Sequence, residues 1–199
     1  MVAAPDGRGG FRFATTQPGS TEPVSYNPCR PIRYVVNPSG APTDYLDLVQ
    51  QSVAEVARAT GFEFEYDGTT DDRDFEHRGG PSARSTPVLI GWATPEEVPE
   101  LAGDVAGLGG SAAVERTPNH FTYVTGMVAL DRDVFARLDQ EPGGFEHLRA
   151  IVMHELGHVV GLAHVDDPAQ LMFADNIGQT SFGPGDLRGL AQLGAVDCL

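Results

Sequence analysis

The sequence predicts an α+β fold in which strands and helices alternate along one domain. Three observations support this prediction. Short apolar or alternating runs typical of strands recur along the chain, and two longer segments, 43–60 and 145–160, place apolar residues at helical spacing. With 199 residues and 41% hydrophobic content, the chain can bury one sizeable core. No apolar run approaches the ~18 residues of a membrane span, so we expect a soluble protein.

The first third of the chain predicts a lead-in segment, two strands and a helix. Residues 1–25 are rich in Gly, Pro, Thr and Ser, which is typical of a tail or an irregular lead-in strand. Ile32–Val36 and residues 62–66 have strand patterns. Between them, a helix should begin at an N-cap, Thr43, and end before Gly61. Its predicted buried stripe is Leu46, Val49, Val53, Val56 and Ala57.

The polar segment 67–87 predicts a loop with a concentration of acidic side chains. Carboxylates are hard oxygen ligands that could bind calcium. The acidic residues concerned are Asp71, Asp72, Asp74 and Glu76. A solvated acidic loop without a metal is the alternative.

The middle of the chain should complete the sheet. Val88–Trp92 has the continuous apolar character of a buried strand, and residues 123–130 form the next strand. Residues 103–114 are rich in glycine but lack the Lys-Ser/Thr ending of a phosphate-binding loop, so we expect no nucleotide site. Within that segment, 111–114 should be an edge strand.

Two further helices are predicted after the sheet. The helix 145–160 has an apolar packing surface made by Phe145, Leu148, Val152, Leu156 and Val159. The last helix covers 184–193, with Pro184 near its start and Gly194 just past its end.

The chain is strongly acidic. It carries 28 Asp and Glu against 13 basic residues, all of them arginine, for a formal net charge of −15. Such a charge argues against nucleic acid and anionic membranes as partners. We expect a monomer.

Residues 154–164 carry the spacing of a catalytic zinc site. His154 and His158 are four residues apart and share one face of a helix, so their imidazoles can reach one ion. Gly161 can take positive φ, end the helix and turn the chain back towards the ion, which makes His164 the third ligand. Three histidines leave a fourth position for water, and Glu155 can reach that water.

This pattern resembles the signature of the metzincin clan of zinc endopeptidases, His-Glu-x-x-His-x-x-Gly-x-x-His followed by a methionine turn. Met172, eight residues after His164, matches that methionine. Within the clan the chain is most similar to bacterial matrixins, since Leu171-Met172-Phe173 and the helix-forming stretch 185–194 both match them.

The resemblance implies a more detailed fold. We expect a twisted, mixed but mostly parallel sheet packed on two long helices. A small C-terminal subdomain would carry the methionine turn and a final helix. In this division the tail is followed by a catalytic domain, 26–199, with an upper subdomain over 26–161 and a lower subdomain over 162–199.

The resemblance also implies endopeptidase activity with one catalytic zinc. Glu155 would accept a proton from the zinc-bound water and pass it to the leaving amine. Met172 would form a hydrophobic floor beneath the metal. The substrate, a protein or peptide, would bind as an extended strand against Ser111, Ala112, Ala113 and Val114. Two alternatives stay open: a zinc-bearing binding module without turnover, and a zinc hydrolase of a non-protein amide.

The sequence leaves the remaining polar candidates near the site open. Asp166, Asp167 and Asp175 could accept hydrogen bonds from the imidazoles, although solvent-facing aspartates are the simpler interpretation. His147, two turns before His154 and roughly on the ligand side of the helix, is expected on the helix surface or in the core, with a substrate contact as the alternative. Two other histidines, His77 and His120, have no ligand spacing.

The two cysteines, Cys29 and Cys198, lie near opposite ends of the globular part. Because chain ends often lie close together, we expect one disulfide, which indicates an oxidising, secreted setting. A Cys29 thiolate masking the zinc and two free thiols are the alternatives. The start of the chain lacks the apolar core of a signal peptide, and the resemblance predicts export, so we expect that an export segment has been removed.

Overall fold

The structure is a computed structural model that describes residues 10–78, 86–175 and 178–198. Its centre is a five-stranded sheet in the order β3-β2-β4-β6-β5. The strands are β2 (Ile32–Asn37), β3 (Phe64–Thr69), β4 (Val88–Ala93), β5 (Gly107–Thr117) and β6 (His120–Asp131). All pairs are parallel except β5 with β6, an antiparallel hairpin. The predicted α+β class and the mixed, mostly parallel sheet are confirmed.

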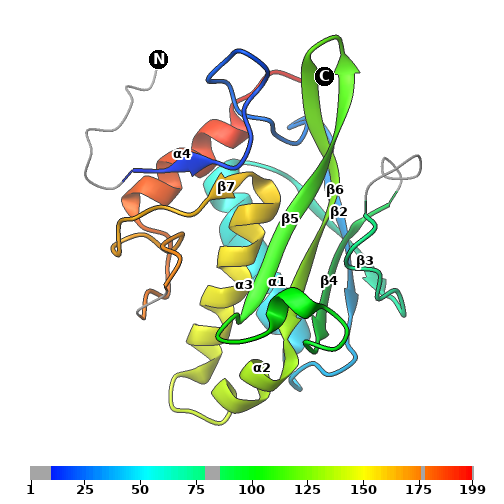
Figure 1. Ribbon diagram of the computed structural model, residues 1–199, viewed down its shortest axis with the longest axis vertical. Helices are drawn as coiled ribbons and strands as arrows, with labels where there is room; N and C mark the ends of the chain where they lie inside the picture. The colour runs from blue at the N-terminus through cyan, green and yellow to red at the C-terminus, as the bar shows by residue number, and fades with distance from the viewer. Residues whose placement is uncertain (1–9, 79–85, 176–177, 199) are drawn as a thin grey trace.

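Two long helices cover one face of this sheet. α1 (Tyr45–Thr60) and α3 (Gly144–Val160) run side by side (Figure 1) and share one apolar cluster with the sheet. All six residues of β4 are buried because both of its faces are covered. Ile90 and Trp92 face the helices, whereas Leu89 packs on the other face against Phe75 and Leu101 from loops and a short turn.

The C-terminal segment adds a smaller layer beside α3. α4 (Pro184–Gly194) packs against α1, and β7 (Leu162–Ala163) pairs with β1 (Arg12–Phe13) in a two-stranded antiparallel sheet. Ala14 also donates a backbone hydrogen bond of 2.8 Å to the carbonyl of Gly161. The N-terminal stretch therefore lies against the end of α3.

Several predicted boundaries were wrong by a few residues. α1 begins after Asp44, not after Thr43, and Asp44 makes no side-chain capping bond, so cap chemistry does not decide where this helix starts. Leu48 is fully buried whereas Leu46 is only half-buried. Residues 62 and 63 precede β3, because its pairing with β2 starts at Phe64.

Two short helical elements were not predicted. α2 (Arg132–Leu138) has only seven residues and directly follows β6. Asp131 caps it by accepting a hydrogen bond of 2.7 Å from the Val134 amide. A 3-10 turn covers Pro99–Leu101. Segments this short show less than two turns of hydrophobic periodicity, so the sequence pattern does not reveal them.

A disulfide joins Cys29 to Cys198, with their Cα atoms 5.6 Å apart. It ties the loop before β2 to the segment after α4. This agrees with the predicted pairing. Because both thiols are in the disulfide, Cys29 does not mask the histidines as a thiolate and neither cysteine is free. Among the described residues, no helix has the length and apolar character needed to cross a membrane.

Candidate metal centre

Three histidine side chains converge beside the C-terminal half of α3. His154 and His158 lie one turn apart on the helix, which Gly161 ends with φ of 122°. The chain then turns back and brings His164 to the same point. The Nε2 atoms of His154 and His158 are 3.1 Å apart, and each lies 3.0 Å from Nε2 of His164. Within the described part of the chain, no other group of three or more His, Cys, Asp or Glu side chains could hold a metal ion.

Backbone carbonyls fix how two of these imidazoles present their nitrogens. Nδ1 of His154 lies 2.8 Å from the carbonyl oxygen of Leu171, and Nδ1 of His158 lies 2.9 Å from that of Leu162. A carbonyl oxygen only accepts, so each Nδ1 carries the proton and each Nε2 presents a lone pair. Lone pairs this close repel one another unless a cation lies between them. Nitrogens at this spacing can all lie about 2.0–2.1 Å from one ion, so the three residues fit zinc.

The three aspartates near the site do not serve as acceptors for His154 or His158. Asp167 accepts hydrogen bonds from the Ala169 amide and the Gln170 side chain, both at 3.0 Å. Asp166 and Asp175 are exposed. Backbone carbonyls, which a sequence motif does not show, therefore orient two of the candidate ligands.

Burial keeps these imidazoles neutral in the metal-free protein. Burial, helped by the neighbouring His158, lowers the pKa of His154 to about 3. Burial also lowers the pKa of His158 to about 4 and that of His164 below its ordinary value. Neutral imidazoles are the metal-binding form, so little proton competition is expected near neutral pH.

We expect the metal-free protein to lose stability between about pH 6.5 and pH 4. Unfolded histidine has a pKa of about 6.5, above the folded values of about 3 and 4 for His154 and His158. Their contribution is therefore complete above the unfolded pKa and is lost as pH falls towards the folded values. Thermal unfolding of chelator-treated protein checks this across that range. A His154→Asn/His158→Asn variant should show a weaker pH dependence. Equal pH dependence in the variant and the wild type would contradict the assignment.

Glu155 lies next to the histidines with only 6% of its surface exposed. Burial raises its pKa to about 8 in the metal-free protein. A divalent cation among the three nitrogens would oppose this shift, because a nearby positive charge favours the carboxylate. The side chain is thus placed where its protonation depends on the metal centre.

Glycines of β5 allow α3 to approach the sheet closely. A Cβ atom at Gly107 would lie 2.9 Å from Cγ of Glu155, and one at Gly109 would lie 2.2 Å from the Glu155 carbonyl oxygen. The sequence prediction placed this stretch in a glycine-rich segment before the edge strand. The structure shows instead that it is the first part of β5, and that the missing side chains make room for Glu155 and its helix.

Gly109→Ala should destabilise the protein by about 1–3 kcal/mol, because the new methyl group would force α3 and β5 apart. Gly110→Ala is the matched control. Nothing lies within 4 Å of a Cβ atom at Gly110, and neither glycine has the positive φ that disfavours alanine. Urea denaturation should give a lower free energy of unfolding for the first variant and a near-neutral change for the second. Equal effects would refute the close-packing argument.

Met172 packs against α3 at Gly157, the residue before His158. It is 1% exposed, and a Cβ atom at Gly157 would lie 2.6 Å from its sulfur. The preceding residue, Leu171, supplies the carbonyl that binds His154. The turn that carries Met172 therefore both packs under the helix and orients one candidate ligand.

Asp186 of α4 holds this turn in place, a role that the sequence did not reveal. Its buried carboxylate accepts hydrogen bonds from the amides of Leu171 at 2.6 Å and Gly183 at 2.9 Å. Gln170 accepts in turn from the amides of Gly185 and Asp186. α4 thus contributes to the metal centre indirectly, by fixing the backbone next to it.

The three histidines and Glu155 open into a cleft of about 1010 Å³. One wall is the start of β5, Gly107–Gly109, and the others include Ile151, His147 and Asp175. His147 is exposed on the surface of α3, which agrees with the expectation, and it faces the cleft from two turns before His154. A cleft of this size can accommodate a segment of peptide rather than only a small molecule.

The predicted substrate strand 111–114 lies further along β5 and does not line this cleft. Ser111 points inwards, where its hydroxyl donates to the Val159 carbonyl at 2.7 Å. Because that hydroxyl proton is used, the Tyr26 hydroxyl, also 2.7 Å away, donates to Ser111. Ser111 thereby joins β5 to the helix that carries the histidines.

The acidic loop shows ion pairs in place of a converging set of carboxylates. Asp72 binds Arg78 at 2.7 Å, and Asp74 accepts hydrogen bonds from the amide and the ring of His77 at 2.9 and 3.1 Å. His120 begins β6, away from the metal centre. Calcium binding by this loop stays a prediction.

A sequence model of the matrixin family matches residues 50–193, which is most of the chain. The chain belongs to the matrixin family. This membership makes it a zinc metallopeptidase, a hydrolase, and the matched segment includes the whole histidine motif and the turn at Met172.

Among solved structures, this matrixin is similar to the crystal structure of archaemetzincin from Methanopyrus kandleri. The two share 17% sequence identity with a TM-score of 0.49, and the alignment covers 79% of this chain and 92% of that one. No match was found among curated proteins.

Proposed function

We propose that this matrixin is a secreted endopeptidase that holds one zinc ion between His154, His158 and His164. The observation that carries the proposal is the convergence of three Nε2 atoms within 3.1 Å, next to a buried carboxylate and inside a large cleft. Three nitrogen ligands leave a coordination position for water, as a catalytic rather than a structural site requires.

The chain supplies proton transfer and positioning around this ion. Zinc held by His154, His158 and His164 would supply Lewis acidity and would lower the pKa of a coordinated water from 15.7 towards ~7. Glu155 accepts the proton of the attacking water and delivers it to the leaving amine. Met172 forms a hydrophobic floor under the histidines, and the carbonyls of Leu171 and Leu162 keep the ligand rings oriented.

The substrate is proposed to be a protein or peptide that binds as an extended strand along β5. β5 is an edge of the sheet, so no other strand in the described part of the chain uses the backbone groups on its outer side. Gly107 and Gly109 line the cleft without side chains. Backbone pairing can therefore begin next to the metal centre and continue towards Ser111–Val114.

The cellular setting is inferred from chemistry. The exposed Cys29–Cys198 disulfide is typical of an oxidising, extracellular environment. The net charge of −15 disfavours nucleic acid and anionic membranes as partners. We infer that the enzyme acts as a secreted monomer.

Cleavage of a peptide library, mapped by mass spectrometry, tests the proposed function. We expect cuts at internal peptide bonds that a chelator abolishes and added zinc restores. Zinc binding without any cleavage would favour a silent binding module. Hydrolysis confined to non-protein amides would favour a zinc hydrolase that acts on such amides and not on peptides. Cuts that persist after complete zinc removal would contradict the proposal.

A further inference from the structure

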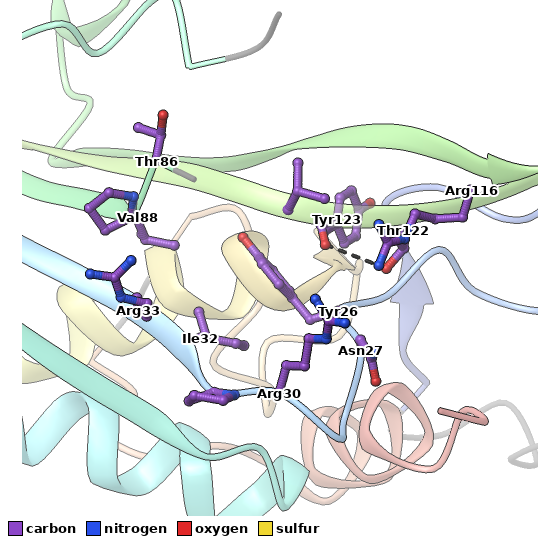
Figure 2. Close-up of a pocket in the computed structure, with 13 residues that line it drawn as sticks. Tyr26, Asn27, Arg30, Ile32, Arg33, Thr86, Val88, Arg116, Thr122 and Tyr123 are labelled. Atoms are coloured by element: carbon purple, nitrogen blue, oxygen red, sulfur yellow. Dashed lines mark hydrogen bonds between the residues drawn. The ribbon is translucent and has the colours of Figure 1, made fainter. Parts of the chain in front are cut away.

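A second cavity, of about 180 Å³, lies at the amino ends of the parallel strands β2, β4 and β6. This volume is well above the ~10–15 Å³ that holds one water and below the ~300–1,000 Å³ of pockets for drug-sized ligands, so it suits a compact ligand. It shares no lining residue with the active-site cleft, which borders the opposite end of β6 through the start of β5. Figure 2 shows its side chains.

The charge of this cavity is opposite to that of the protein. Its thirteen lining residues include three arginines, Arg30, Arg33 and Arg116, and no Asp or Glu. The whole chain has 28 acidic residues against 13 basic ones. A wall with only positive formal charge is therefore unusual for this molecule and favours an anionic ligand.

Two of these guanidinium groups have no partner within the described part of the chain. Arg33 binds Asp67 at 2.7 Å, so its charge is largely matched. Arg30 and Arg116 make no side-chain hydrogen bond or ion pair with any described residue. They approach the cavity from different segments, the loop before β2 and the strand β5 (Figure 2).

The remaining walls are mainly apolar and well fixed. Tyr26, Ile32, Val88 and Tyr123 are buried, and the rings of Tyr26 and Tyr123 lie 5.7 Å apart. The Tyr26 hydroxyl is held by Ser111, and the loop carrying Arg30 is held by the Cys29–Cys198 disulfide. The cavity is thus formed before any ligand binds, which lowers the entropic cost of binding.

We propose that this cavity binds a small oxyanion, a carboxylate or a phosphate, carried on a compact apolar body. Guanidinium groups present paired N–H donors that match both oxyanions. The tyrosine rings and aliphatic side chains can pack against the apolar part. The site is separate from the metal centre and does not depend on the proposed peptidase activity.

Binding to zinc-loaded protein can be measured with simple probes. Benzoate and phenyl phosphate supply the two oxyanions on an apolar ring, benzamide is the neutral control, and acetate and inorganic phosphate lack the ring. Titrations at constant ionic strength, followed by amide NMR shifts, should show benzoate or phenyl phosphate perturbing Thr122 and Val124. Whichever of these two binds more tightly identifies the preferred oxyanion. Benzamide, acetate and inorganic phosphate should bind at least tenfold more weakly.

Arginine variants test whether the guanidinium groups are responsible. Arg30→Gln and Arg116→Gln should each weaken binding by about tenfold or more, since each removes charge-assisted hydrogen bonds. Arg58→Gln is the matched control, because Arg58 is exposed on α1 and pairs with Glu55. Unchanged thermal unfolding would show that the variants are folded.

Four results would overturn the proposal. The first is binding of benzamide as tight as that of benzoate. The second is equal weakening by all three arginine variants. The third is probe-induced shifts confined to residues 154–164, which would place the anion on the zinc. Absence of any saturable shift would also overturn it.

Discussion

Glu155→Gln should lower the rate of peptide hydrolysis by about 10²–10⁴-fold while leaving about one equivalent of zinc bound. The substitution keeps the size of the side chain and removes its ability to accept a proton. Glu155 is not one of the three residues whose nitrogens converge, so metal binding should survive its replacement. The loss should appear mainly in kcat, since the proton transfer occurs in the chemical step.

The structure also predicts that Glu155→Gln will fold. Burial raises the pKa of Glu155 to about 8, so the metal-free protein near neutral pH already holds mostly the protonated, uncharged group at this position. Replacing that group by a neutral amide should therefore leave the unfolding temperature close to that of wild type. A loss of activity can then be assigned to chemistry rather than to misfolding.

Glu146→Gln is a suitable control for this experiment. Glu146 lies on the same helix, in its first turn, but is exposed and does not line the cleft. It should keep wild-type turnover. Wild-type turnover in Glu155→Gln would rule out the proton-transfer role. Loss of zinc together with activity would show instead that the carboxylate is needed to bind the metal.

Removing the disulfide should produce the largest loss of stability. Cys29 and Cys198 are separated by 169 residues, and in the chain-entropy model a loop of this length stabilises the fold by about 5 kcal/mol. The total stability of a domain is about 5–15 kcal/mol, so a Cys29→Ser/Cys198→Ser variant would lose a large fraction of it. Both cysteines are exposed, so reduction of the wild type should have a similar effect.

Urea denaturation of three samples measures this contribution: oxidised wild type, reduced wild type and the double serine variant. We expect the oxidised protein to be the most stable and the other two to agree with each other. A difference below about 1 kcal/mol would contradict the chain-entropy estimate. It would mean that the two ends stay together without the covalent bond.

Local patterns predicted the sheet strands and the long helices because each has a clear period or apolar run. Val88–Trp92 and the stretch around Val49 and Val53 are of this kind, and both are buried in the structure. β5 was only partly predicted, because three of its first four residues, Gly107, Gly109 and Gly110, have no side chain from which a strand pattern could be recognised. Their strand conformation results from pairing with β6 and from the close approach of α3.

The candidate site was likewise predicted only in part from the sequence. The sequence by itself determined which side chains can meet, because a four-residue spacing on a helix puts His154 and His158 on one face and a glycine lets the chain return with His164. These features depend on residue identity and short-range geometry, which a sequence displays directly. The disulfide was expected as one of three possibilities for the two cysteines, and the structure decided between them.

Only the tertiary structure decided how those side chains are held. The carbonyls of Leu171 and Leu162 orient the rings, and Asp186 fixes the turn beneath them from a separate helix. The arginines of the second cavity likewise come together from distant segments. Every residue has a backbone carbonyl, so the sequence does not show which of them accepts a hydrogen bond. Contacts between distant segments depend on packing of the whole chain. For this reason the spacing of the motif predicted the chemistry of the centre, and only the fold revealed its surroundings.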